Sequence, residues 1–454
     1  MLDLIIKNGR VVTHSGIRKL DIGVQNEKIS ALASELSDAS RKTIDASGKL
    51  VLPGMFDCHT HMGIPILNTH SIDDFESGSV AAAFGGITSI IDFTVQEKGQ
   101  TLRESIEARL KKAQGKSHID YGLHVNVTDD PENRLNEIPR LAHEGFRFFK
   151  VFSTYRKAGM MLSWDQFRLI LQKVDDHGGL LFLHAEDNDL VETMTNEHLE
   201  NGQTSAMYHP LSRTCEAEAY AIKIAAEIAG ELDASIYIVH LSSKAGLEAA
   251  LEARNNGVNI YLETCPQYLL LTDEKYRQKN GHFWITTPPL RKQEDCSALW
   301  RALADGDIDV VATDHCPFTV QQKNAGGAQF HLTPNGIPGV ETLFPLLYTF
   351  GVEMGRIRLP RLLEVLAEKP AQLFGLQGKK GTIQIGADAD FVIWNPNQKS
   401  QLPATNLHGN ADWSPYEGME IAGELDYTIL RGHILVNHGE FTGNEVRGKS
   451  LCYP

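Results

Sequence analysis

Between residues 51 and 375, compact apolar runs rich in β-branched side chains alternate with longer amphipathic stretches. The runs have the length of buried strands, and the stretches between them have the periodicity of helices. Eight such runs follow one another: VLPGMFDCHTH, TSIIDFT, IDYGLHVNV, RFFKVFS, GLLFLHAE, ASIYIVHLS, NIYLETCPQY and IDVVATDHCP. Eight strand–helix units over somewhat more than the usual ~250 residues predict an α/β fold, a (β/α)8 TIM-like barrel, with active residues at the C-terminal ends of its strands.

Both ends of the chain show a different pattern, in which short runs alternate apolar and polar residues between turn signals such as Asn-Gly and Ser-Gly. Residues 1–50 show it, and it returns in 381–396 and 426–441. Alternation with a period of two is typical of short strands in an antiparallel sheet. We therefore expect residues 1–50 and 376–454 to form one small β-sandwich domain together, with the barrel, residues 51–375, inserted between its halves.

The composition narrows the range of partners. The 454 residues are 42% hydrophobic and 22% charged, and 43 basic against 58 acidic residues give a net charge of −15. This charge repels phosphate backbones and anionic lipid, and no apolar segment approaches the ~18 residues that cross a bilayer, so we expect no nucleic-acid or membrane partner. No CxxC pair or signal-peptide pattern occurs, which predicts a reduced, cytoplasmic protein. The six isolated cysteines are Cys58, Cys215, Cys265, Cys296, Cys316 and Cys452.

Several of the eight runs end in a residue that binds metal ions. These residues are His59, His61, His184, His240 and Asp314. An HxH pair arises easily by chance, and a lone buried histidine is more often satisfied by a neighbouring polar group. However, residues i and i+2 of a strand share a face, so both imidazoles of the pair point into the barrel mouth, as chelation of one ion requires. Their shared position at strand ends favours a metal site.

Lys150 lies inside the apolar run FRFFKVF, where a charged ammonium is costly to bury. A snorkelling or ion-paired lysine is the structural explanation for such a residue. Burial also lowers the pKa of a lysine and makes its amine nucleophilic, so that it reacts with carbon dioxide to give a carbamate. Because a carbamate is an anionic oxygen ligand that bridges two metal ions, Lys150 suggests a two-metal site.

Ordered motifs along almost the whole chain resemble one known family, the cyclic-amidohydrolase branch of the amidohydrolase superfamily. This branch contains D-hydantoinase, dihydropyrimidinase, allantoinase and dihydroorotase. The matching motifs are LVLPGMFDCHTHM, AAAFGGITSIIDF, FKVFSTY, LHAED, IVHLSS, ETCPQYL, TPPLR, ATDHCPF, PNGIPGVET, EKPAQLFGL, KGTIQIGADAD and SPYEGM.

The resemblance implies a binuclear centre, usually of Zn²⁺, with Mn²⁺ or Fe²⁺ as alternatives. Two such cations lower the pKa of a shared water and polarise the scissile carbonyl, and Asp314 is the implied general base and acid. The implied ligands are His59, His61 and Asp314 on one ion, His184 and His240 on the other, and carbamylated Lys150 as the bridge.

The resemblance also suggests a substrate class. Gly63 stands where dihydroorotases have arginine and allantoinases tend to have asparagine, so neither is favoured. KVFSTY is similar to the hydantoinase and dihydropyrimidinase pattern, which implies that the Tyr155 hydroxyl stabilises the oxyanion. Thr287 and Asn335 are the implied ligands of the imide ring. The implied reaction is hydrolysis of hydantoins or dihydropyrimidines to N-carbamoyl amino acids.

Two segments leave alternatives open. Residues 62–74 lack the Pro-Phe-Gly-Gly-Thr loop of D-hydantoinases, and residues 337–342 are more similar to allantoinase or dihydroorotase. Allantoinase, another cyclic ureide hydrolase and an L-selective hydantoinase therefore remain alternatives. A non-catalytic dihydropyrimidinase-like scaffold is disfavoured because every ligand position is filled. The resemblance further implies a homotetramer or homodimer, with contacts through helices and segments such as residues 442–454.

Overall fold

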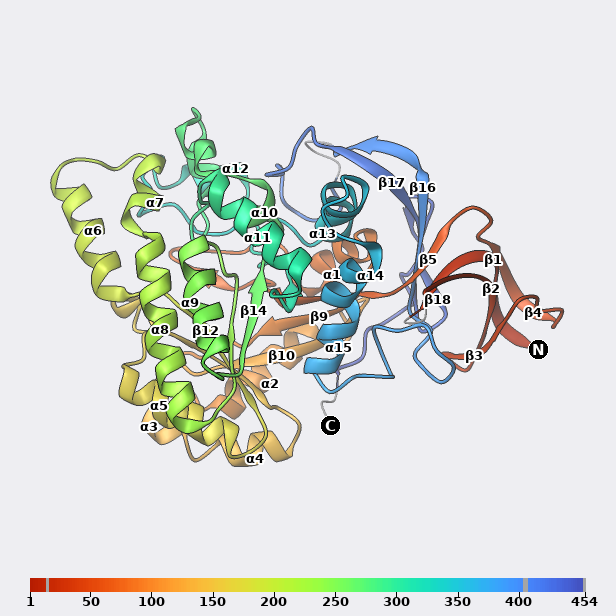
Figure 1. Ribbon diagram of the computed structural model, residues 1–454, viewed down its shortest axis with the longest axis horizontal. Coiled ribbons are helices and arrows are strands. Elements are labelled where there is room, and N and C mark those ends of the chain that lie inside the picture. The colour runs from red at the N-terminus through yellow and green to blue at the C-terminus, as the bar shows by residue number, and fades with distance from the viewer. Residues whose placement is uncertain (14–15, 403–406, 452–454) are drawn as a thin grey trace.

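The computed structural model describes residues 1–13, 16–402 and 407–451. It contains two large sheets, one built from the middle of the chain and the other from both of its ends (Figure 1). Among the described residues, no helix is both long enough and apolar enough to span a bilayer. Five of the six cysteines are free thiols, and Cys452 lies outside the described residues.

The central sheet is the predicted barrel. Its strands follow the order β15-β14-β13-β12-β11-β10-β9-β6, and every neighbouring pair is parallel. Each of the eight apolar runs supplies one strand, which confirms the sequence-based prediction. The strands are β6 (Met55–Thr60), β9 (Ile87–Phe93), β10 (Asp120–Asn126), β11 (Phe148–Phe152), β12 (Leu180–His184), β13 (Ile236–Ile238), β14 (Ile260–Thr264) and β15 (Val310–Val311).

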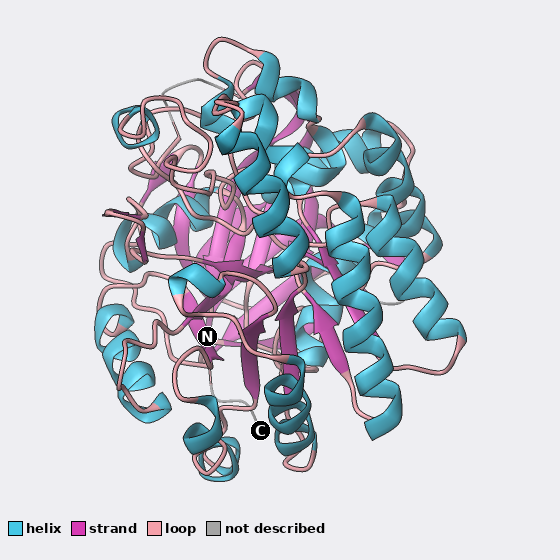
Figure 2. Ribbon diagram, turned by 90° about the vertical axis from the view of Figure 1, so that its left-hand side faces the viewer, coloured by secondary structure: helices cyan, strands magenta, loops and turns pink. Residues whose placement is uncertain are grey.

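Helices surround these strands, as Figure 2 shows, so the barrel strands are covered on both faces and need apolar residues throughout. Local sequence signals explain where several helices begin. Thr101 and Ser163, for example, form capping boxes with Glu104 and Gln166. The helices are α1 (Phe75–Phe84), α2 (Leu102–Ala113), α3 (Pro131–Arg134), α4 (Ile138–His143), α5 (Trp164–Asp175), α6 (Asn188–Glu200), α7 (His209–Ser212), α8 (Cys215–Leu232), α9 (Lys244–Asn255), α10 (Pro266–Leu270), α11 (Gln293–Asp305), α12 (Val320–Asn324), α13 (Leu343–Leu347), α14 (Leu359–Leu363) and α15 (Lys369–Leu373).

The first and last barrel strands meet at a polar seam. An isolated parallel bridge joins Thr60 to His315, and the His61 amide donates to the His315 carbonyl at 2.9 Å. Below it, the Asp57 carboxylate accepts the Thr313 amide at 3.0 Å and also the Thr313 hydroxyl. Because a fully buried carboxylate is costly without donors, this pairing ties the ends of β6 and β15 together where both carry predicted site residues.

The second sheet is built from both chain ends, in the order β19-β18-β17-β16-β5-β1-β2-β3, with β4 paired to β1. The antiparallel prediction was wrong in part, because β1 is parallel to both β4 and β5. β1 is long enough to pair with β4 along its first half and with β5 beyond a bulge. The strands are β1 (Leu2–Thr13), β2 (Gly16–Gln25), β3 (Lys28–Ala33), β4 (Ser40–Asp45), β5 (Leu50–Pro53), β16 (Phe391–Gln401), β17 (Glu420–Leu430), β18 (His433–Asn437) and β19 (Glu440–Phe441).

The chain passes from this terminal sheet into the barrel at Gly54. β5 ends at Pro53 and β6 begins at Met55, so the first sheet reaches slightly past residue 50. A Cβ atom on Gly54 would lie 2.2 Å from the Thr88 hydroxyl oxygen, so only glycine fits this close crossing. The division into residues 1–50 plus 376–454 and residues 51–375 stays a prediction.

A buried ionic network joins the barrel to the terminal sheet. The Lys380 Nζ atom lies 2.7, 3.1 and 2.6 Å from carboxylate oxygens of Asp120, Asp388 and Asp390. Arg431 forms a second ion pair with Asp120, at the start of β10. We call these five residues the junction network. Two of its three negative charges are offset within the network, and Lys28 pairs with Asp388 from outside it, so each buried ion has a partner, as tolerated buried ions require.

Candidate metal centre

Three predicted ligands meet at the barrel mouth. The Nε2 atoms of His59 and His61 lie 3.2 and 2.9 Å from one carboxylate oxygen of Asp314. One potential ligand atom from each residue lies within 4.8 Å of the other two. His59 is in β6, His61 follows that strand, and Asp314 follows β15. The structure therefore brings together the HxH pair from the first barrel strand and an aspartate that follows the last one.

The other two histidines complete a continuous row of imidazoles. The rings of His184 and His240 have centroids 4.5 Å apart, and the His240 ring lies 5.5 Å from that of His59. His184 ends β12, whereas His240 follows β13 with a positive φ of 39°. Asp314 also has a positive φ, 54°. A left-handed backbone is unfavourable for both residue types, and such strain is typical of functional sites.

Lys150 lies in β11 and is almost completely buried. Its Nζ atom lies 5.6 and 5.3 Å from the ring centroids of Phe93 and Phe152. Burial lowers the pKa of Lys150 to about 7, although Glu263 and Asp314 partly oppose the shift. Within the described ranges no carboxylate comes within ion-pair distance of this amine. The ion-paired explanation therefore fails, and a large fraction of the amine is neutral at neutral pH.

Glu263 is the residue before the last in β14, and its carboxylate contacts both His59 and His240. Sequence reasoning did not single it out. Its carboxylate lies 2.7 Å from His59 Nδ1 and accepts the His240 amide at 3.0 Å and the Tyr237 hydroxyl at 2.9 Å. A proton on Nδ1 of His59 leaves the Nε2 lone pair facing Asp314. Burial raises the pKa of Glu263 to about 7. The signal in the sequence was a charged residue inside the apolar run NIYLET.

His184 is oriented by a second carboxylate. Its Nε2 atom lies 2.7 Å from Glu186, which also forms an ion pair with Arg213. Burial acts to raise the pKa of Glu186, but Arg213 and His184 together have the larger effect and lower it to about 2. The carboxylate therefore stays ionised. With Nε2 engaged by Glu186, Nδ1 is the atom of His184 that would bind a cation.

The hydrogen bonding of two ring nitrogens at the barrel mouth indicates that a cation would fit there. Nδ1 of His61 and Nδ1 of His240 are buried and have no hydrogen-bond partner among the described residues. Burial lowers the pKa of His240 far below its usual value, so this imidazole is neutral and has a lone pair to donate. His59 and His61 hold the pKa of Asp314 below its usual value although burial opposes ionisation. The neutral His240 imidazole, an ionised carboxylate and the Lys150 amine, which has no ion partner within the described residues, fit a divalent metal centre.

A second group of carboxylates has metal-like spacing but a different character. Asp120, Asp388 and Asp390 also place oxygen atoms within 4.8 Å of one another. Lys380 lies among them, at 2.6 to 3.1 Å from all three. This group already contains its cation, and it therefore does not fit a metal site.

Comparisons with known proteins agree with this geometry. The amidohydrolase family matches residues 50–435. The chain belongs to this family. It is 39% identical over 455 residues to a D-hydantoinase from Ralstonia pickettii, which covers 99% of this chain and 98% of that protein. The crystal structure of dihydropyrimidinase from Brevibacillus agri NCHU1002 matches with a TM-score of 0.97 at 36% identity, covering 100% of this chain and 99% of the other. An L-hydantoinase (dihydropyrimidinase) structure from Arthrobacter aurescens gives 0.89 at 31% identity and 97% coverage of each chain.

In this amidohydrolase, Tyr155 lies beside the histidine row. It follows β11 with a positive φ of 68°, and its ring centroid lies 5.1 Å from that of His184. Burial raises the pKa of the phenol well above its usual value, with Arg213 opposing the shift, so the hydroxyl stays a hydrogen-bond donor. The Thr287 hydroxyl is buried without a normal hydrogen bond in the described part of the chain, yet it lies close enough to lower the pKa of Tyr155. Asn335 is half-buried.

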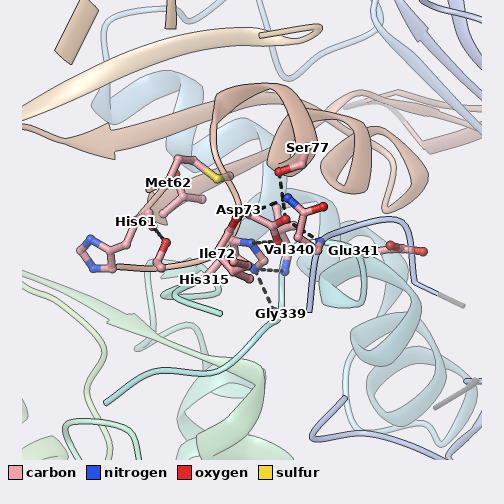
Figure 3. A network of polar contacts seen from close by, with 12 residues as sticks. His61, Met62, Ile72, Asp73, Ser77, His315, Gly339, Val340 and Glu341 are labelled. Atoms are coloured by element: carbon pink, nitrogen blue, oxygen red, sulfur yellow. Dashed lines mark hydrogen bonds and ion pairs between the residues drawn. The ribbon is translucent and has the colours of Figure 1, made fainter. Parts of the chain in front are cut away.

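His315, next to Asp314, belongs to a network of polar contacts that sequence reasoning did not single out (Figure 3). Its Nδ1 atom accepts the amides of Gly339 and Val340 at 3.1 and 3.2 Å. Its Nε2 atom therefore carries the proton and donates to Asp73 at 3.1 Å. Asp73 lies in the loop of residues 62–74, so this amidohydrolase anchors its divergent loop directly to the residue that follows Asp314.

Proposed function

We propose that this amidohydrolase opens the ring amide of hydantoins or dihydropyrimidines by hydrolysis, giving N-carbamoyl amino acids. The observation that carries the proposal is the convergence of His59, His61 and Asp314 beside a buried Lys150 that has no ion partner among the described residues. The full-length similarity to proteins named D-hydantoinase and dihydropyrimidinase supports the same substrate class. The substrate partner is accordingly a small cyclic amide or ureide.

The proposed centre holds two divalent cations, with Zn²⁺ as the first candidate and Mn²⁺ or Fe²⁺ as alternatives. When bound, the two cations lower the pKa of a shared water and polarise a carbonyl. The lone pair of the unprotonated Lys150 amine attacks carbon dioxide, and loss of one proton gives a carbamate with two ligand oxygens. The proposed ligands are His59, His61 and Asp314 for one ion, His184 and His240 for the other, and carbamylated Lys150 for both.

The proposed proton carrier is Asp314. Its carboxylate is ionised and lies between two imidazoles, so it accepts the proton of the attacking water and then donates it to the departing ring nitrogen. Tyr155, held protonated by burial, donates its hydroxyl to the oxygen on which negative charge develops. Thr287 and Asn335 bind the imide, whose carbonyl, N–H and carbonyl groups alternate as acceptor, donor and acceptor.

A hydrolysis panel on metal-loaded protein tests this proposal. Purified enzyme is incubated with dihydrouracil, hydantoin, 5-substituted hydantoins and allantoin, and ring opening is followed by product chromatography. We expect the first three substrates to be opened faster than allantoin. Preferential hydrolysis of allantoin would replace the proposal with allantoinase, and absence of bound metal after gentle purification would favour a non-catalytic scaffold. The panel with D- and L-substituted hydantoins also determines stereoselectivity.

A further inference from the structure

A third buried lysine, Lys323 in α12, is not one of the proposed metal ligands. Its side chain is fully buried, and its Nζ atom donates to the carbonyl oxygens of Ile285 at 2.9 Å and Pro334 at 2.8 Å. The Ile285 carbonyl also accepts the Gly336 amide at 3.0 Å. Lys323 thereby joins two segments that are distant in sequence. One leads into Thr287, and the other contains Asn335.

Other buried donors fix the first of these segments residue by residue. His209 Nε2 lies 2.8 Å from the Thr286 carbonyl, and the Tyr268 hydroxyl donates to the Pro288 carbonyl at 2.7 Å. Together with Lys323, these side chains hold the carbonyls on both sides of Thr287. The main chain of residues 285–288 is therefore oriented by three different elements, and the Thr287 hydroxyl is left without a normal hydrogen bond among the described residues.

Burying a lysine at position 323 costs free energy. Burial lowers its pKa to about 7, and in the described chain it forms no ion pair with a carboxylate. Its neighbours include two carbonyl oxygens, the Cys316 thiol and the Phe318 ring, whose centroid lies 5.5 Å from Nζ. A methionine or leucine would fill the same volume without the cost of burying an amine. What only an amine supplies is two N–H donors that reach both carbonyls at once.

We infer that Lys323 is a positioning residue that holds the segments 285–288 and 334–337 in the relative orientation needed for Thr287 and Asn335 to bind the two sides of a cyclic imide. This inference rests on the proposed function, in which these two residues recognise the ring. Lys323 acts through the backbone and contacts no reacting atom. His209 holds the same segment through the Thr286 carbonyl.

Lys323→Met in the full-length, metal-loaded enzyme tests the inference. We expect KM for hydantoin and dihydrouracil to rise by about tenfold or more with kcat changed by less than about threefold, because two buried hydrogen bonds that orient ground-state binding groups are lost. Metal content is expected to stay at the wild-type level. Hydrogen–deuterium exchange is expected to increase in peptides containing residues 285–288 and 334–337, and not in peptides containing Lys150 or His184.

Matched variants keep the test decisive. Lys380→Met removes a buried lysine from the junction network and is expected to lower stability with KM unchanged. If Lys323→Met does not fold, His209→Leu is measured instead, with His209→Gln, which retains an N–H donor, as the conservative variant. We expect the leucine variant to raise KM and the glutamine variant to restore it. An unchanged KM, or a fall in kcat alone, would overturn the inference.

The exchange measurement separates this inference from the proposed function. If wild-type enzyme opens no cyclic amide, the proposed function fails, and the exchange of the two segments still decides whether Lys323 holds them together. Increased exchange confined to both segments would then support the inference that Lys323 holds them together. Exchange equal to that of wild type in Lys323→Met would overturn it.

Discussion

Lys150 in the barrel mouth and Lys380 in the junction network are the same residue type, each only 2% exposed. Both lie near three metal-like ligands. Burial acts to lower the pKa of both amines. At Lys150 this effect prevails, and the pKa is about 7. At Lys380 three adjacent carboxylates outweigh burial, and the pKa is raised above its usual value.

The difference shows that ligand type and spacing alone do not identify a metal site. In the junction network, Lys380 and Arg431, together with Lys28 on Asp388, supply three positive charges for the three carboxylates. In the mouth, two imidazole nitrogens lack hydrogen-bond partners in the described chain, and the Lys150 amine has no ion-pair partner there. Uncompensated buried polar groups cost free energy, and a protein retains them where a ligand or reaction uses them.

Replacing Lys150 with alanine is expected to have the largest effect. The variant should lose metal and activity together, with activity reduced by about 10³-fold or more, because several kcal/mol of charge stabilisation at the reacting carbonyl depend on the bound ions. Metal analysis and the hydrolysis assay measure the two losses. Added short-chain carboxylic acid should restore part of the activity by occupying the bridge. Full activity in the variant would contradict a bridging role.

Lys380→Met tests the other side of the comparison. It leaves three carboxylates buried without their main cation, so the free energy of unfolding should fall by about 3–5 kcal/mol while activity per folded molecule stays unchanged. Chemical denaturation measures the fall. Lys28→Met is the matched control, because Lys28 pairs with Asp388 but is 44% exposed, and its removal should cost about 1 kcal/mol or less. Equal losses in the two variants would show that burial does not set the energetics of the network.

Glu263→Gln examines a carboxylate that orients ligands within the mouth. The change keeps the shape but removes the charge that fixes the His59 proton on Nδ1, so metal affinity should fall by about 10- to 100-fold. Competition with a chelator measures the affinity. Glu218→Gln is the control, because Glu218 is another buried carboxylate, hydrogen-bonded to Ser242 and Ser243 and not to an imidazole. The hypothesis fails if both variants retain wild-type affinity.

Acid is expected to lower the free energy of unfolding through His209, outside the junction network, by a smaller amount. Burial first, and Arg213 second, lower the pKa of His209 from 6.5 to about 3. Because the folded pKa is depressed, the unfolded chain binds this proton first, and stability falls as the pH drops below 6.5. The loss amounts to about 2 kcal/mol at pH 5. Asp388 has a folded pKa below 3.8, so its contribution is lost only at more acidic pH.

Denaturation at pH 7 and pH 5 checks this prediction in wild type and His209→Gln. The glutamine variant should lose less stability than wild type between the two pH values, by about the same 2 kcal/mol. Identical pH dependence in both proteins would mean that His209 does not take up the proton on unfolding.

Much of the fold could be predicted because the informative signals are local. Each of the eight strands came from a short apolar run whose period is visible in a few residues, and His59 and Asp314 were placed by the ends of those runs. The parallel pairing of β1 with β4 and β5 was not predictable in this way, since alternation gives a strand without its neighbour. The roles of Glu263, Lys323 and the His315 network also required the folded chain, because each depends on groups far away in sequence.

The sequence by itself determined the order of strands and helices and the residues that end each strand, because backbone periodicity and capping are set by near neighbours. Only the tertiary structure decided which buried charges acquire a counter-charge. That outcome depends on contacts of a few ångströms between residues that are hundreds of positions apart, as in the pairing of Asp120 with Arg431 across the two sheets. The same chemistry of lysine and carboxylate therefore became a structural joint in one place and a proposed reaction centre in the other.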